Sequence, residues 1–194
     1  MLPPTRAIMR GAMADESRKG DPLLCFVEIP KGSRNKYEWD EETGAIMLDR
    51  FLFSSMHYPT DYGFIPDTLG EDGDALDAMV CVSEPTFPGC VIPVKPIALF
   101  RMEDDAGIDD KVLCVPLSDP AWSPLEDLDD LPQQLQKEIE HFFSVYKDLE
   151  QKKVKVDGWH SKEEALEEIE EARKRHAKQD EEQEADAKEK AEDA

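Results

Sequence analysis

Three aspartates stand within six residues in the segment EDGDALDAM (71–79), namely Asp72, Asp74 and Asp77, with no basic residue among them. Like charges this close repel one another and raise one another's pKa, so a chain that keeps them together usually holds a cation there. An EF-hand calcium loop is not indicated, because its template fails at positions 5, 6 and 12 counted from Asp72. The segment alone leaves two interpretations open, a cation site and a solvated acidic turn.

A second acidic segment, MEDDAGIDDK (102–111), has Asp104 and Asp109 on either side of Ala106-Gly107, with Lys111 just after them. If this segment is a hairpin, its tight turn brings the two carboxylates face to face. Two acidic groups that converge on one face could hold several hard cations through oxygen ligands. An isolated acidic hairpin is the alternative.

The expected strands also carry an unusual set of polar residues: Glu28, Lys31, Lys36, Glu38, Arg50, Tyr58 and Tyr62. Strand alternation places Lys36 and Glu38 on the same side. A wall that has a cation beside a carboxylate suits an anion that carries metals, and phosphate is the natural candidate. Neither a P-loop nor a G-x-G-x-x-G motif occurs, so a nucleotide site is not indicated. Surface ion pairing is the alternative explanation.

Short strands must position these residues. We expect them at 23–30, 35–40, 45–53, 77–83, 90–103 and 111–117, with a hairpin turn at 41–44. Strands of this length, separated by such turns, favour a small closed or nearly closed barrel.

Helix signals arrive only later in the chain. Pro132 suits a first helical position, and an apolar face follows it at Leu135, Ile139, Phe142, Phe143, Tyr146 and Leu149. Ser161 and Glu164 form a capping box for a second helix that runs to about Arg175. We therefore expect a flexible leader (1–20), a barrel domain (21–176) and a charged tail (177–194) that is a solvated helix or disordered.

The composition of the chain limits the classes of partner and the location that we expect. The 194 residues fit one domain, and a net charge of −22 argues against nucleic acid as the main partner. No apolar run approaches the ~18 residues of a membrane span, and no secretory signal is seen, so we expect a cytoplasmic protein without membrane partners. Four cysteines without a C-x-x-C pair predict buried, reduced thiols. The excess of 45 acids over 23 bases indicates either a salt-rich cytoplasm or an ordinary acidic protein.

Five segments in order, VEIPKGSRNKYEWD, LDRFLFSSMHYPTDYGFIPDTL, DGDALDAMV, EDDAGIDDKV and HFFSVYKDLE, resemble the soluble family I inorganic pyrophosphatases. The resemblance runs from about Cys25 to about Arg175. Its D-x-D-x-x-D signature and the flanking Y-P-x-x-Y-G-F are highly specific. One departure is Ala75, where the family usually has proline or glutamate, which puts loop rigidity in question rather than chemistry.

The resemblance implies an α+β, mainly β fold: an OB-like five-stranded β-barrel with two C-terminal α-helices packed outside. It implies Mg²⁺-dependent hydrolysis of pyrophosphate to two phosphates, with Mn²⁺ or other divalent ions as possible substitutes, and a homo-oligomer, a hexamer rather than a dimer. Asp74 would be the general base that activates a metal-bound water, with Tyr58 as a supporting residue. The implied metal ligands are Asp72, Asp77, Asp104, Asp109, Glu28 and Glu38. The implied substrate-binding residues are Lys36, Arg50, Tyr62, Lys111, Tyr146 and Lys147.

Electrostatics agrees with this assignment. Six or more carboxylates would repel pyrophosphate unless bound metals reverse the local charge. Two alternatives stay open at this point: an OB-type nucleic-acid binder and a metal-buffering module without catalysis. A phosphate-release assay with Mg²⁺ separates all three.

Overall fold

The computed structural model describes residues 22–105 and 107–192. Five strands form a closed ring, because the first strand pairs with both the second and the last strand around it. In ring order they are β1 (Leu23–Ile29), β4 (Asp61–Phe64), β5 (Asp77–Val80), β8 (Lys111–Pro116) and β6 (Val91–Asp104). Only the β5–β8 pair is parallel. The expected five-stranded barrel is confirmed.

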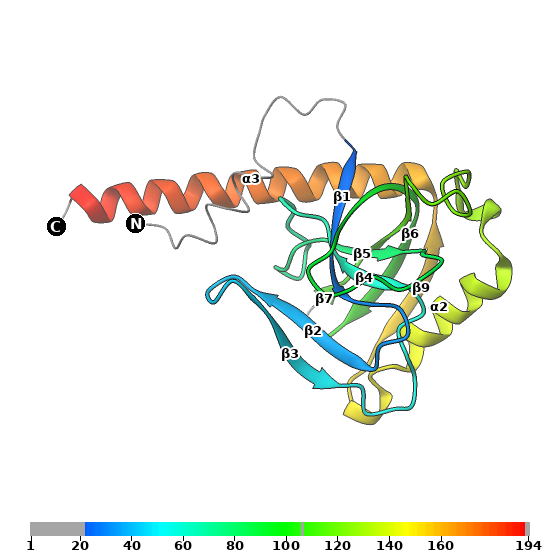
Figure 1. The fold of residues 1–194 in the computed structure, drawn as a ribbon. Coiled ribbons are helices and arrows are strands. Elements are labelled where there is room, and N and C mark those ends of the chain that lie inside the picture. The colour runs from blue at the N-terminus through cyan, green and yellow to red at the C-terminus, as the bar shows by residue number, and fades with distance from the viewer. Residues whose placement is uncertain (1–21, 106, 193–194) are drawn as a thin grey trace.

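Three further features extend from the ring (Figure 1). The short strand β7 (Gly107–Ile108) and the strand β9 (Lys155–His160) both pair with β6. A separate two-stranded sheet, β2 (Asn35–Asp40) and β3 (Ala45–Phe51), projects from the barrel as a hairpin. Its turn is the expected one: Gly44 has φ of 65°, and its amide donates to the Asp40 carbonyl at 2.8 Å.

The two faces of the barrel wall are both apolar. Ala78, Val80 and Val112 point to one side and pack with α3 residues, whereas Met79 and Leu113 point to the other side and pack with α2 residues. This period of two is what a strand buried on both faces requires. The wall is therefore rigid where it presents Asp77 and Lys111.

Two α-helices follow the barrel, α2 (Gln133–Val145) and α3 (Lys162–Glu192), with two short 3₁₀ helices, η1 (Leu128–Asp130) and η2 (Asp148–Glu150). Pro132 lies just before α2 as its N-cap rather than inside its first turn. The predicted capping box of α3 is present, since the Glu164 amide donates to Ser161 Oγ at 3.2 Å and the Ser161 amide donates to Glu164 Oε2 at 3.1 Å.

α3 includes residues 177–192 of the charged tail, for which a solvated helix was one of the two expected alternatives. It continues past Arg175 to Glu192, and its C-terminal half extends beyond the barrel (Figure 1). This half is rich in strong helix formers, and pairs such as Lys178 and Glu182, 3.8 Å apart, support it. Among the described residues, no helix is both long enough and apolar enough to cross a membrane.

Two strands and one cysteine differ from what the sequence led us to expect. The strands β4 and β9 were not predicted, and the expected leader (1–20) lies outside the described residues. All four cysteines are free. Cys25, Cys81 and Cys114 are buried, but Cys90 is partly exposed.

Candidate active site

Lys111 is the centre of the site. The parallel register of β5 and β8 places Asp77 directly beside it. Its Nζ lies 2.6 Å from Asp77 Oδ2, 2.5 Å from Asp109 Oδ1 and 2.9 Å from the Tyr62 hydroxyl. Burial alone would lower the pKa of Lys111, but Asp77 and Asp109 raise it well above its usual value. A cation that is only 1% exposed thus holds two of the predicted metal ligands together.

The pKa of Asp109, one of the two carboxylates beside Lys111, is also shifted. Burial raises the pKa of Asp109, and Lys111 offsets part of that rise. The Tyr62 hydroxyl donates a short hydrogen bond to Asp77. Burial likewise raises the pKa of Tyr62, so this hydroxyl keeps its proton and acts as a donor.

A second lysine–carboxylate pair lies at the end of α2. Lys147 Nζ is 2.6 Å from Asp104 Oδ2 and lies 5.1 Å from the centre of the Tyr146 ring. The expected face-to-face placement of Asp104 and Asp109 is wrong. Asp104 pairs with Gly107, and the Asp109 amide donates to the Met102 carbonyl at 2.9 Å. This register makes the two aspartates diagonal neighbours on one face, so each meets a different lysine.

The loop between β4 and β5 carries the remaining aspartates. The Gly70 amide donates to the Asp74 carbonyl at 2.6 Å, and the Asp74 amide donates to Asp72 Oδ1 at 3.2 Å. Burial raises the pKa of the half-buried Asp72, whereas Asp74 is exposed. Beside the loop is a small open cleft, whose acidic lining is Glu71, Asp72, Asp77, Asp109, Asp110 and Glu168.

The wall formed by β1, β2 and β3 supplies the other predicted residues. Burial raises the pKa of Glu28 to about 7, although its Oε1 accepts a hydrogen bond from the Trp39 amide at 2.6 Å. Lys36 pairs with Glu38 on the same side of β2, as predicted, through a short contact. Arg50 Nε lies 3.0 Å from Glu150 Oε1.

Asp49 connects the cations of this wall. It lies 3.3 Å from Lys36 Nζ and also pairs with Arg50 through a short contact. Both basic side chains are about four-fifths buried, at 20% and 21% exposed. Two cations held side by side at a wall suit an anionic ligand with more than one charge.

The tyrosines form an aromatic floor. Tyr58, Tyr62 and Tyr146 are all buried, and α2 provides the rings against which they pack. Tyr58 lies 4.9 Å from Phe142 between ring centres, and Tyr62 lies 6.0 Å from Phe143. Lys111 Nζ also lies 5.3 Å from the centre of the Phe143 ring, so the aromatic layer contacts the central lysine as well.

The sequence did not single out Asp49, Glu150 or Asp110. Glu150 is buried against Arg50, a contact across 100 residues that no local pattern could indicate. Asp110 is buried, pairs with Arg101 Nε at 3.2 Å, and keeps its Oδ1 without a hydrogen-bond partner. The sequence did offer one signal for Asp110, which is its position next to Asp109. On an extended segment successive side chains point to opposite sides, so Asp110 had to face away from Asp109.

The predicted metal ligands fit a hard divalent cation, since all of them are carboxylates that offer oxygen atoms. Among residues 22–105 and 107–192, no three acidic, histidine or cysteine side chains already form a metal-binding group. Lys111 and Lys147 instead neutralise Asp77, Asp109 and Asp104. Burial nevertheless leaves carboxylates such as Glu28 with raised pKa values, which is the condition that an added positive charge relieves.

Known proteins are similar to this chain in both sequence and fold. Residues 25–177 match the inorganic pyrophosphatase family. The inorganic pyrophosphatase of Methanosarcina mazei is 57% identical over 154 residues, which span 79% of this chain and 91% of that protein. The solved structure of the Helicobacter pylori inorganic pyrophosphatase has a TM-score of 0.80 at 40% identity, covering 85% of this chain and 99% of that one. The Thermus thermophilus structure has a TM-score of 0.79 at 42% identity, covering 84% and 95%. This chain therefore belongs to the family I inorganic pyrophosphatases.

Proposed function

We propose that this chain is a Mg²⁺-dependent inorganic diphosphatase in which Asp74 is the general base. The broader activity follows from its family: the chain hydrolyses inorganic pyrophosphate, and this family uses divalent metal ions. Membership in an enzyme family favours turnover over the two alternatives, a nucleic-acid binder and a metal buffer without turnover.

One observation supports the role of Asp74 in particular. Asp77, Asp104 and Asp109 are each paired with a lysine, whereas the Asp74 carboxylate is exposed and has no hydrogen bond or ion pair within the described part of the chain. The turn around Asp74 is nevertheless fixed, because its amide and carbonyl are both hydrogen-bonded. A free carboxylate on a fixed turn can accept a proton from an attacking water.

The metal ligands proposed are Asp72, Asp77, Asp104, Asp109, Glu28 and Glu38. Bound Mg²⁺ would supply the positive charge that lets an anionic substrate enter and that makes a water more acidic. Asp77 and Asp109 also hold Lys111 in the structure, so this lysine lies beside two of the residues that would hold the metal. Mn²⁺ or another divalent ion would be a possible substitute.

The substrate-binding residues proposed are Lys36, Arg50, Tyr62, Lys111, Tyr146 and Lys147, with Tyr58 in support. Burial fixes these side chains, so their donors are oriented before substrate binds. Lys111 and Tyr62 meet at one end of the site, and Lys36 and Arg50 share Asp49 at the wall. Such donors would stabilise charge on the leaving phosphate.

Replacing Asp74 with Asn tests the general base. Asn keeps the shape of the side chain but removes its basicity, so phosphate release should fall by roughly 10²- to 10⁴-fold. Affinity for Mg²⁺ and pyrophosphate should change much less. Asp77→Asn is the matched comparison, because it should weaken metal binding itself, and excess Mg²⁺ should restore part of its activity. Near-normal turnover of Asp74→Asn at saturating Mg²⁺ would show that another group accepts the proton.

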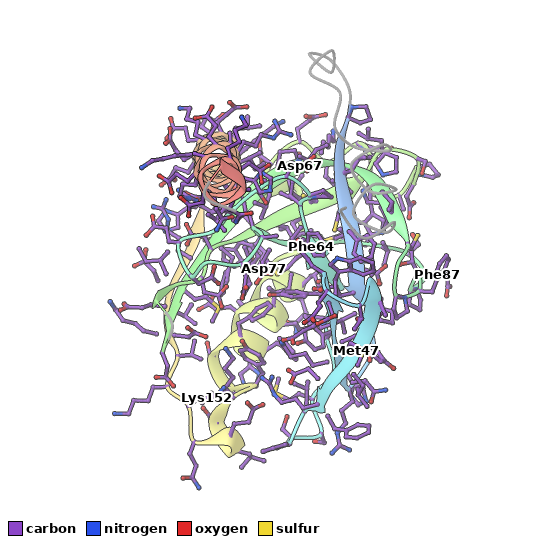
Figure 2. The ribbon with its side chains drawn as sticks, turned by 90° about the vertical axis from the view of Figure 1, so that its left-hand side faces the viewer. Met47, Phe64, Asp67, Asp77, Phe87 and Lys152 are labelled. Atoms are coloured by element: carbon purple, nitrogen blue, oxygen red, sulfur yellow. The ribbon has the colours of Figure 1, made fainter. Side chains whose placement is uncertain are left out.

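We also propose a homo-oligomer, with a hexamer favoured over a dimer. Large apolar side chains are about half exposed on and beside the β2–β3 hairpin: Met47, Leu48, Phe51 and Phe53 (Figure 2 labels Met47). Exposed apolar groups that gather in this way are typical of protein interfaces. Light scattering at micromolar concentration tests assembly, and a stable monomer would refute it. A cytoplasmic location is proposed as well, and four free cysteines support it.

A further inference from the structure

The loop that carries Asp72 and Asp74 is closed at its base by hydrogen bonds. The Ile65 amide donates to the Leu76 carbonyl at 2.9 Å, and the Leu76 amide donates to Thr68 Oγ1 at 2.9 Å. Thr68 Oγ1 in turn donates to the Ile65 carbonyl at 2.5 Å. These contacts join the two ends of the loop, but they leave its direction relative to the barrel to other groups.

Helix α3 supplies those groups at Leu69. The Leu69 amide donates to the Ala172 carbonyl at 2.9 Å, and Arg175 Nε donates to the Leu69 carbonyl at 2.7 Å. Both polar backbone groups of Leu69 are thus held by α3, one residue before Gly70 opens the acidic turn.

Arg175 is itself fixed. Its Nη2 forms a short ion pair with Glu168, whose side chain is 14% exposed and lines the acidic cleft. The guanidinium therefore uses one edge for Glu168 and its Nε for Leu69, a geometry that a planar fork provides and a lysine cannot. The neighbouring Arg173 lacks this arrangement: it is 48% exposed and lies 3.5 Å from Glu170 on the same helix.

We propose that Arg175 is a positioning residue that fixes the loop of residues 70–76, so that Asp72 and Asp74 stay in place for metal binding and proton transfer. The proposal rests on the roles proposed above for those two aspartates. Leu69 directly precedes Gly70, from which hydrogen bonds lead to both aspartates. The Gly70 amide donates to the Asp74 carbonyl, and the Asp74 amide donates to Asp72 Oδ1. A shift of Leu69 is therefore passed to both carboxylates.

The test compares Arg175→Gln with Arg173→Gln as a matched control, in the full chain and at several Mg²⁺ concentrations. A displacement of about 1 Å at a catalytic group can lower turnover by up to about 100-fold. We therefore expect kcat of Arg175→Gln to fall by roughly 10- to 100-fold and its half-saturating Mg²⁺ concentration to rise. The KM for pyrophosphate should change less, because none of the proposed phosphate-binding residues lies in this loop. Arg173→Gln should match the unmodified protein.

Hydrogen exchange gives a readout that does not depend on activity. Without metal, amides in residues 69–76 of Arg175→Gln should exchange about tenfold faster, while those of β5 and β8 keep their protection. Arg175→Lys keeps the charge but has a single donor nitrogen in place of the guanidinium fork, so it should recover part of both effects. If Arg175→Gln does not fold, Glu168→Gln releases the other edge of the guanidinium and should show a smaller change of the same kind.

The outcomes separate this proposal from the one on which it rests. Equal exchange, kcat and Mg²⁺ dependence in Arg175→Gln and Arg173→Gln would overturn the positioning role, even if Asp74→Asn is inactive. Loss of protection throughout the barrel would also overturn it, because Arg175 would then support the whole fold. Normal turnover in Asp72→Asn and Asp74→Asn would overturn both proposals.

Discussion

Replacing Lys111 with Met should destabilise the metal-free protein strongly. The lysine is 1% exposed, and its Nζ has three partners within 2.9 Å: Asp77, Asp109 and Tyr62. Met retains much of the buried stem but leaves two carboxylates facing each other without a cation. Breaking a buried pair by removing one partner costs about 3 to 5 kcal/mol. For a chain of this length we expect Tm to fall by roughly 6 to 20 °C.

The assay is urea unfolding in a chelator, with protein concentration held constant because assembly also affects stability. Lys155→Met is the control, since Lys155 is 80% exposed and lies 3.4 Å from Glu103. An exposed pair of this kind contributes about 0 to 1 kcal/mol. Added Mg²⁺ should then stabilise Lys111→Met more than the unmodified protein, because the unpaired carboxylates gain a cation. Two variants of equal stability in chelator would refute the view that Lys111 holds these carboxylates together.

Three other expectations concern glycines and salt. Gly63→Ala should cost about 3 kcal/mol in urea unfolding. Its Cβ would lie 1.9 Å from the Phe26 carbonyl oxygen and 2.9 Å from Val27 Cα, so a loss below about 1 kcal/mol would contradict the close β1–β4 approach. Gly70→Ala should change stability little but weaken Mg²⁺ binding in a calorimetric titration, because its Cβ would lie 2.7 Å from Asp72 Oδ1. Unchanged affinity for Mg²⁺ would argue against Asp72 as a ligand. KCl raised from about 0.1 to about 2 M should raise Tm by screening the net charge of −22, and a steady fall of both Tm and activity would exclude adaptation to salt.

Local signals in the sequence predicted those parts of the fold that neighbouring residues decide. Ser161 and Glu164 are three residues apart, so their capping box could be read directly, and the structure contains it. Lys36 and Glu38 meet because a strand alternates its side chains, and the β2–β3 turn follows from the residues within it. The motif around Asp72, Asp74 and Asp77 was sufficient to indicate the family, which the comparisons confirm.

Other elements escaped because their signals are not local. The strand β4 is four residues long, and β9 is mostly polar, so neither shows a clear period. Each exists because another strand, β1 or β6, offers its backbone groups for pairing. The length of α3 beyond Arg175 was left open for a related reason, since a polar helix and a disordered tail have similar compositions.

The residue types of the site could be read from the sequence, but their partners could not. Asp77 and Lys111 are 34 residues apart, and only the parallel β5–β8 register makes them neighbours. The pairs of Lys147 with Asp104 and of Arg50 with Glu150 span 43 and 100 residues. Electrostatic interactions act through space and depend on burial, and both are set by the way the chain closes into a ring. Sequence alone therefore determined which charges this protein carries, while the tertiary structure decided which of them face one another and how far each pKa is shifted.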